Sequence, residues 1–156
     1  AFVRIERRYK PYHNALAALV KATRERFGSA FLIDFHSMPS QQLDRGNWPD
    51  FVLGDRFGAS CAPEVTRLTQ GFLKSLGYRV ALNKPYAGGY ITEHYGKPGS
   101  GVHVLQVEID RSLYMDEETC EKSPSFASLH SDVTRVIAML VEQLSHWSSG
   151  FKIAAE

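Results

Sequence analysis

A continuous apolar run over residues 29–35, Ser-Ala-Phe-Leu-Ile-Asp-Phe, constrains the fold of this chain most strongly. A glycine precedes the run, and a proline follows it closely. A short apolar run bounded in this way predicts a strand buried on both faces, which is typical of parallel sheets. The strand ends in polar side chains that must find partners or take part in chemistry: Asp34, His36 and Ser37.

Helical and strand-like segments alternate along the rest of the chain. Apolar side chains at a three-four spacing predict amphipathic helices at residues 11–27, 63–77 and 125–147. Short apolar runs predict further strands at 51–55, 78–83 and 102–110. The stretch 84–101 is rich in glycine and proline and is expected to form loops or broken turns. The expected apolar faces are Tyr12, Leu16, Leu19, Val20, Thr23 and Phe27 in the first helix, and Val133, Val136, Ile137, Leu140, Val141 and Leu144 in the last.

This order of elements predicts an α/β fold with a mixed or largely parallel sheet. The chain has 156 residues, which fits a single domain over 1–156, and 44% of them are hydrophobic, enough to bury a core. No repeat, low-complexity tract or interdomain linker is visible in the sequence.

Charge and cysteine content exclude several classes of function. The formal net charge is +1, with 18 basic and 17 acidic side chains, so nothing favours a nucleic-acid or membrane partner. No apolar stretch approaches the roughly 20 residues that span a bilayer. Cys61 and Cys120 lie far apart and form no CxxC pair, which argues against a disulfide framework or a cysteine zinc site. A reducing, cytoplasmic setting is expected.

Polar residues follow three of the predicted strands, and ligands of open α/β sheets gather at the carboxyl ends of strands. The three polar groups are Asp34-His36-Ser37, Gly54-Asp55-Arg56 and Glu108-Asp110-Arg111. Their clustering at strand ends predicts a functional site at that edge of the sheet.

His36 and Glu108 are the main candidates for chemistry. A neutral imidazole at the end of a strand suits zinc, and Asp34 could orient it from behind. The alternative is a histidine that only bonds loop backbone, since zinc needs about three protein ligands. Glu108 lies on an otherwise apolar strand, where desolvation would raise its pKa toward that of a general base. The alternative for Glu108 is an ion pair with Arg111 or Arg56.

The remaining candidates carry weaker signals. Arg56 and Arg111 could each clamp a substrate carboxylate, although a surface ion pair is the alternative for both. His94 lies in the glycine-rich stretch and is a candidate substrate contact. His103 points to the apolar side of its strand by alternation, which predicts a structural role. Two more histidines lie on predicted helices and are expected at the surface or in packing: His13 and His146.

Five stretches carry a resemblance to a known family: YKPYHNALAALV, LIDFHSMPS, PDFVLGDRFGASC, NKPYAGGYITEHYG and HVLQVEIDRSLYMDE, which together cover most of Tyr9–Glu117. In this order they resemble the N-formylglutamate amidohydrolases, or formylglutamate deformylases, of bacterial histidine degradation. The resemblance implies a zinc-carboxypeptidase-like (phosphorylase/hydrolase-like) fold, a three-layer α/β/α sandwich around a mixed, largely parallel sheet.

The resemblance also implies roles for individual residues. His36 matches the later of the family's zinc ligands, with Asp34 and Ser37 arranged around it, and Glu108 matches the carboxylate that activates the zinc-bound water. Four positions look like substrate contacts: Arg56, Asn83, Tyr86 and Arg111. The family's chains are longer, so the other ligands of the single zinc ion are expected upstream of residue 1. This chain would then be the C-terminal part of a longer amidohydrolase domain, with weak zinc binding and exposed apolar sheet edges.

The activity expected from the resemblance is zinc-dependent hydrolysis of N-formyl-L-glutamate to formate and L-glutamate. The expected partner is a small acidic N-acyl amino acid. Two alternatives stay open: a zinc hydrolase of the same fold that acts on another N-acyl amino acid or a peptide, and a non-catalytic relative that binds a small ligand.

Overall fold

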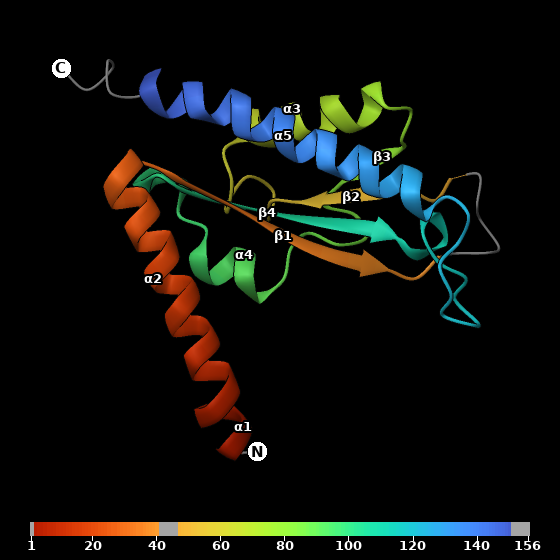
Figure 1. The fold of residues 1–156 in the computed structure, drawn as a ribbon. Coiled ribbons are helices and arrows are strands. Elements are labelled where there is room, and N and C mark those ends of the chain that lie inside the picture. The colour runs from red at the N-terminus through yellow and green to blue at the C-terminus, as the bar shows by residue number, and fades with distance from the viewer. Residues whose placement is uncertain (1, 41–46, 151–156) are drawn as a thin grey trace.

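Four strands form one mixed sheet at the centre of the computed structural model, which describes residues 2–40 and 47–150, with side chains up to residue 145 (Figure 1). The strands are β1 (Ala30–Met38), β2 (Phe51–Gly54), β3 (Val80–Leu82) and β4 (Val102–Asp110). Their order across the sheet is β1-β4-β2-β3. β1 is parallel to β4 and β2 is parallel to β3, whereas β4 and β2 are antiparallel.

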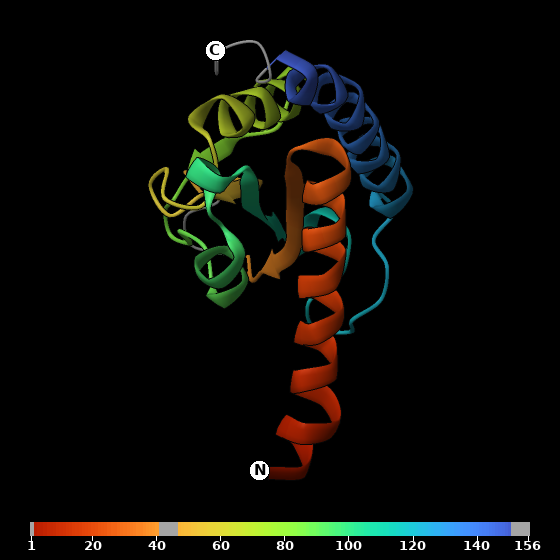
Figure 2. The same cartoon turned by 90° about the vertical axis from the view of Figure 1, so that its left-hand side faces the viewer.

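Helices cover both faces of this sheet. They are α1 (Phe2–Arg4), the π-helical turn Ile5–Tyr9, α2 (Lys10–Phe27), α3 (Pro63–Ser75), α4 (Tyr90–Tyr95) and α5 (Phe126–Gly150). Short 3₁₀ turns lie at Pro98–Ser100 and Arg111–Leu113. α3 and α5 lie on one face, and α2 and α4 lie on the other (Figures 1 and 2). The predicted three-layer α/β/α fold with a mixed sheet is therefore confirmed.

The two faces of β4 bury different cores because successive side chains point to opposite sides of a strand. Leu105 and Val107 pack against α3 and α5 in the larger core. Val102 and Val104 pack with Tyr95 on the face of α2 and α4. The apolar packing on this second face covers the first half of β4, and its second half carries polar side chains.

The prediction that the first strand is buried on both faces is wrong. β1 forms an edge of the sheet among the described residues, because it pairs there with β4 alone. Phe35 is therefore 43% exposed, in line with the expectation of an exposed apolar edge. A cavity of about 740 Å³ lies beside this edge, between β1, the end of α2 and α5.

The predicted apolar faces of the first and last helices are only partly buried. Val136, Leu140 and Leu144 lie in the core, whereas Ile137 and Val141 of α5 line the cavity beside β1 and are exposed. In α2, Leu16 and Val20 pack against the sheet. Other members of the α2 face are exposed: Tyr12, Leu19 and Phe27. The N-terminal part of α2 extends past the sheet (Figure 2), whereas Phe27 ends the helix and lines the cavity beside β1.

Two further expectations need correction. The stretch 84–101 contains a helix, α4, which begins directly after the glycine pair 88–89. The carboxyl end of β2 does not lie beside those of β1 and β4, because β2 runs antiparallel to β4 and Gly54 pairs with Gln106 in the middle of that strand. None of the described helices is long and apolar enough to cross a membrane.

Candidate functional site

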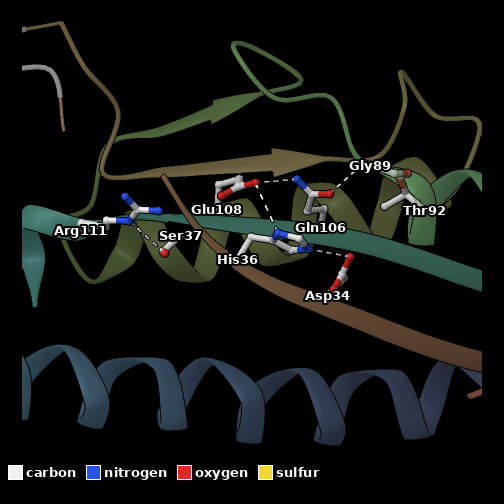
Figure 3. A network of polar contacts seen from close by, with 8 residues as sticks. All are labelled: Asp34, His36, Ser37, Gly89, Thr92, Gln106, Glu108 and Arg111. Atoms are coloured by element: carbon white, nitrogen blue, oxygen red, sulfur yellow. Dashed lines mark hydrogen bonds and ion pairs between the residues drawn. The ribbon is translucent and has the colours of Figure 1, made fainter. Parts of the chain in front are cut away.

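Four polar side chains form a compact group on the sheet face that α2 and α4 share (Figure 3). Asp34 and His36 come from β1, and Gln106 and Glu108 come from β4. In the parallel register His36 lies opposite Glu108, and Asp34 lies opposite Gln106. Residues two apart on a strand share a face, so the register alone brings the four side chains together.

His36 is held between two carboxylates. Its Nε2 lies 3.1 Å from Oδ2 of Asp34, and its Nδ1 lies 4.0 Å from Oε1 of Glu108. A carboxylate accepts hydrogen bonds, so the contact with Asp34 favours the proton on Nε2. In that tautomer of the neutral ring, Nδ1 is the acceptor nitrogen and lies on the side that faces Glu108. The His36 side chain is 48% exposed, so this nitrogen belongs to a ring that solvent or a ligand can reach.

Glu108 is the most buried carboxylate of the group, with a side chain only 9% exposed. Burial raises its pKa, while the neighbouring imidazole of His36 and the hydrogen bond from Gln106 act in the opposite direction. The expected desolvation is therefore confirmed. The alternative of an arginine ion pair is not what the described residues show, since the nearest polar partners of Glu108 are Gln106 and His36.

Arg56 was expected beside the carboxyl ends of β1 and β4. It instead contacts the turn at 87–89, which lies next to the polar group. It follows β2 in a tight turn with φ of 53°, and its backbone N–H donates to the carbonyl of Ala87 over 2.8 Å. Its guanidinium contacts the carbonyl of Gly88 at 3.5 Å and pairs with Glu93 of α4 at 3.3 Å. The turn at 87–89 thus connects Arg56 to the polar group, because the next residue, Gly89, bonds to Gln106.

Asn83 holds a loop in place in this structure. Its side-chain oxygen accepts hydrogen bonds from the backbone N–H groups of Asp55 and Phe57, at 3.1 and 3.2 Å. Its side-chain nitrogen donates to the carboxylate of Asp55 over 2.8 Å. These contacts engage both the oxygen and the nitrogen of the Asn83 amide, and none of them involves His36. Tyr86 lies half-buried in the segment between Asn83 and the turn.

Arg111 and Ser37 contact each other rather than His36. The guanidinium Nε of Arg111 donates to the hydroxyl of Ser37 over 3.3 Å. Ser37 is one residue beyond His36, so alternation along β1 directs it to the other face. The positive charge of Arg111 also lowers the pKa of Glu108, and it is the smallest of the influences on that pKa.

His94 lies in an aromatic cluster between α4 and α2, away from His36. Its ring stacks on Tyr90 with centroids 5.0 Å apart and meets Tyr95 edge-on at 4.7 Å. The expected packing role of His13 is confirmed, because its ring stacks on Tyr95 and its Nδ1 lies 2.7 Å from the tyrosine hydroxyl. The side chain of His146 falls outside the described residues.

His103 has the structural role that alternation predicts. Its ring stacks on Phe31 of β1 with centroids 4.8 Å apart, and its Nδ1 accepts the backbone N–H of Ala62. Burial lowers its pKa, as expected for an imidazole kept neutral inside a protein.

One residue of the group, Gln106, carried no functional prediction. Gln106 is buried on the same face as Glu108, and its amide bonds to Glu108 at 2.8 Å and to the Gly89 N–H at 2.7 Å. A buried glutamine on an apolar strand, two residues before a candidate base, is the sequence signal that could have identified it.

A zinc ion would find one fitting ligand in this group. The Nδ1 of His36 is suited to a metal because the contact with Asp34 favours the proton on the other ring nitrogen, Nε2. The described residues contain no set of three or more histidine, cysteine or acidic side chains placed to hold a metal. Zinc binding by this chain therefore stays a prediction.

Comparisons with known proteins agree on one family. The profile of the family described as N-formylglutamate amidohydrolase matches residues 1–115, a range that contains every predicted site residue. The N-formylglutamate deformylase of Pseudomonas putida is 36% identical over 148 residues, 93% of this chain and 55% of the relative. That of Pseudomonas aeruginosa is 38% identical over 142 residues, 89% of this chain and 53% of the relative.

Solved structures give the same result. An N-formylglutamate amidohydrolase from Ralstonia eutropha JMP134 superposes with a TM-score of 0.82 at 38% identity, over 94% of this chain and 53% of that one. A gene product of Agrobacterium tumefaciens shares the fold with a TM-score of 0.64 at 15% identity, over 92% of this chain and 53% of its own. The chain spans about half the length of the curated relatives that it matches. By profile, by sequence identity and by structure, the chain belongs to the N-formylglutamate amidohydrolase family.

Proposed function

We propose that the protein hydrolyses the formyl amide of N-formyl-L-glutamate and releases formate and L-glutamate. The observation that supports this most is the pairing of His36 with the buried Glu108 across two parallel strands, in a chain whose relatives are named N-formylglutamate deformylases. The reaction needs a base beside the attacking water and an acid for the leaving nitrogen, and one carboxylate can serve as both in turn.

Glu108 is the group proposed for this proton transfer. Its burial raises its pKa, which makes the carboxylate a stronger base than an exposed glutamate. It accepts a proton from water as the water oxygen attacks the formyl carbon. It then returns that proton to the amide nitrogen as the C–N bond breaks, which leaves a free amino group and formic acid, and the acid loses its proton to give formate.

We also propose that His36 is one ligand of a zinc ion whose other ligands lie beyond the described residues. Bound zinc would lower the pKa of water and polarise the formyl oxygen. Within this chain, Asp34 fixes the ring of His36 by its contact with Nε2, so that Nδ1 faces the side of Glu108. The imidazole is thereby prepared for a ligand that binds on that side.

The acidic substrate would be held by positive and polar side chains around this pair. Arg56 and Arg111 are the proposed partners of its two carboxylates, because a guanidinium binds a carboxylate with two hydrogen bonds. Arg56 is already paired with Glu93, so substrate binding at Arg56 would replace an exposed ion pair. Asn83, Tyr86 and His94 remain predicted contacts, although Asn83 bonds to the Asp55–Phe57 loop and His94 stacks on Tyr90 in this structure.

Formate release from N-formyl-L-glutamate tests the proposal. We expect release that stops when a chelator removes the metal and returns when zinc is added back. N-acetyl- and N-succinyl-L-glutamate serve as matched substrates, because a deformylase should lose most of its rate when the formyl group is enlarged. Faster turnover of these substrates would favour the alternative of another N-acyl amino acid hydrolase. Ligand binding without any turnover would favour a non-catalytic relative.

We also propose that this reaction belongs to bacterial histidine degradation and takes place in the cytoplasm, as the resemblance of the sequence to the family implies.

A further inference from the structure

Gln106 lies between Glu108, the proposed base, and the glycine turn that precedes α4. It lies on β4 two residues before Glu108, and only 4% of the residue is exposed. Both ends of its side-chain amide are engaged, the nitrogen by Oε1 of Glu108 at 2.8 Å and the oxygen by the N–H of Gly89 at 2.7 Å (Figure 3). A buried amide with both ends satisfied has little freedom to rotate.

The chemistry of the partners determines which way this amide points. The backbone N–H of Gly89 can only donate, so the oxygen of Gln106 must face it. The nitrogen of Gln106 must then face Glu108, where it donates to Oε1. A glutamate at position 106 could not supply this donor as a carboxylate, and it would place a second negative charge beside the base. Glutamine is therefore suited to hold Glu108 without adding charge.

The turn at the other end of Gln106 is itself fixed in place. Thr92 donates from its hydroxyl to the carbonyl of Gly89 over 2.6 Å, on the opposite side of that residue from Gln106. Gly88 adopts φ of 115°, and an added Cβ there would lie 2.5 Å from the Thr92 hydroxyl. The guanidinium of Arg56 contacts the carbonyl of this same Gly88. The turn thus contacts Gln106 through the N–H of Gly89 and Arg56 through the carbonyl of Gly88.

We propose that Gln106 is a positioning residue that ties Oε1 of Glu108 to the Gly88–Gly89 turn and so fixes the base relative to Arg56. The inference rests on the proposed function, because Glu108 and Arg56 have their roles only in that reaction. Oε1 is held by Gln106 and also faces His36, so Oε2 is the oxygen available for the proton of water.

Gln106→Met tests this link, the two hydrogen bonds from Gln106 to Glu108 and Gly89. Methionine has a similar length and lacks both hydrogen-bonding groups. Gln70→Met is the matched control. Gln70 lies on α3, on the other side of the sheet, and its amide donates to the carbonyl of Val80. The control loses one glutamine hydrogen bond without touching the polar group around Glu108.

Hydrogen exchange of the Gly89 amide is the first measurement, and it needs no activity. Loss of a hydrogen bond of about 1 kcal/mol should speed exchange about fivefold in Gln106→Met. The amide of Gly96, at the end of α4, bonds to the carbonyl of Thr92 and should keep its rate. Gln70→Met should leave both rates unchanged. An unchanged Gly89 rate in Gln106→Met would overturn the link.

Steady-state kinetics is the second measurement. A displaced base lowers kcat, and we expect a fall of about 10- to 100-fold in Gln106→Met. The turn keeps its hydrogen bond from Arg56 N–H to Ala87, so KM should change less than about threefold. Gln70→Met should keep both constants. Unchanged kcat together with faster exchange would overturn the positioning role.

The two measurements separate the inference from the proposed function. If the wild-type protein releases no formate, the proposed reaction fails, and with it the catalytic part of the inference. The exchange of Gly89 still supports or overturns the link between Gln106 and the turn. Formate release by the wild type with unchanged exchange in the variant overturns the inference alone.

Discussion

Replacement of Gly54 by alanine tests how the turn at 87–89 is held against the sheet. Gly54 ends β2 opposite Gln106, and the backbone of Ala87 and Gly88 lies directly over it. An added Cβ would lie 2.7 Å from the carbonyl carbon of Ala87 and 2.7 Å from the nitrogen of Gly88. These are backbone atoms, so no flexible side chain can move aside to make room.

Two responses to the added methyl group are available, and both destabilise the protein. If the turn stays in place, overpacking costs about 1–3 kcal/mol. If the turn lifts away, it loses the hydrogen bonds from Arg56 N–H to Ala87 and from Gly89 N–H to Gln106, at about 1 kcal/mol each. Either way the free energy of unfolding should fall by about 2 kcal/mol.

Denaturant unfolding measures this loss, and Gly71→Ala is the matched control. Gly71 lies inside α3 with open space around its Cα, and alanine there should stabilise the protein by about 0.5–1 kcal/mol. The two glycine-to-alanine changes are thus expected to have opposite signs. A Gly54→Ala protein as stable as the wild type would refute the close docking of the turn on β2.

Three further predictions follow, two from burial and pKa and one from the contact between Asp34 and His36. A thiol reagent at pH near 8 should label the exposed Cys120 and leave Cys61 unlabelled, because burial raises the pKa of Cys61 to about 12. After denaturation both cysteines should react, and mass spectrometry would count the labels. Burial lowers the pKa of His103 from 6.5, so below that pH the unfolded chain binds more protons and stability falls as pH falls. His103→Gln should weaken this pH dependence of denaturant unfolding, whereas replacement of the exposed His130 by glutamine should preserve it. Asp34→Asn should lower zinc affinity about 10- to 100-fold by weakening the partner of His36, as measured by titration with a competing chelator; equal affinity would contradict that role.

The pairing of His36 with Glu108 was predictable from the sequence because both residues lie near the carboxyl ends of apolar strands. In adjacent parallel strands those ends meet at the same edge of the sheet, and the register places the two residues opposite each other. Alternation also separated Glu108 from His103, which points to the other face and packs against Phe31.

The position of Arg56 was not predictable in the same way. An apolar run indicates a strand and says nothing about its direction in the sheet. β2 runs antiparallel to β4, so Arg56 reaches the site through the turn at 87–89. The glycines of that turn gave only a loop signal, and the hydrogen bond from Gly89 to Gln106 joins residues 17 positions apart. Such a contact depends on tertiary packing that local patterns do not encode.

Exposed apolar sheet edges were expected, but which side chains of β1 and α5 are exposed was unpredictable for a related reason. Periodicity identifies the apolar face of an element, but it does not show what covers that face. Ile137 and Val141 lie on the predicted apolar face of the last helix, and Phe35 lies in the apolar run of the first strand, yet all three are exposed beside the edge strand.

Formate release by Glu108→Gln, with N-formyl-L-glutamate at saturation, tests the central claim most directly. Glutamine keeps the size of the side chain and cannot accept the proton of water. We predict that kcat falls about 100- to 10,000-fold while the protein stays folded and KM changes little. A Glu108→Gln protein whose kcat stays within about twofold of the wild type would contradict the assignment of Glu108 as the base.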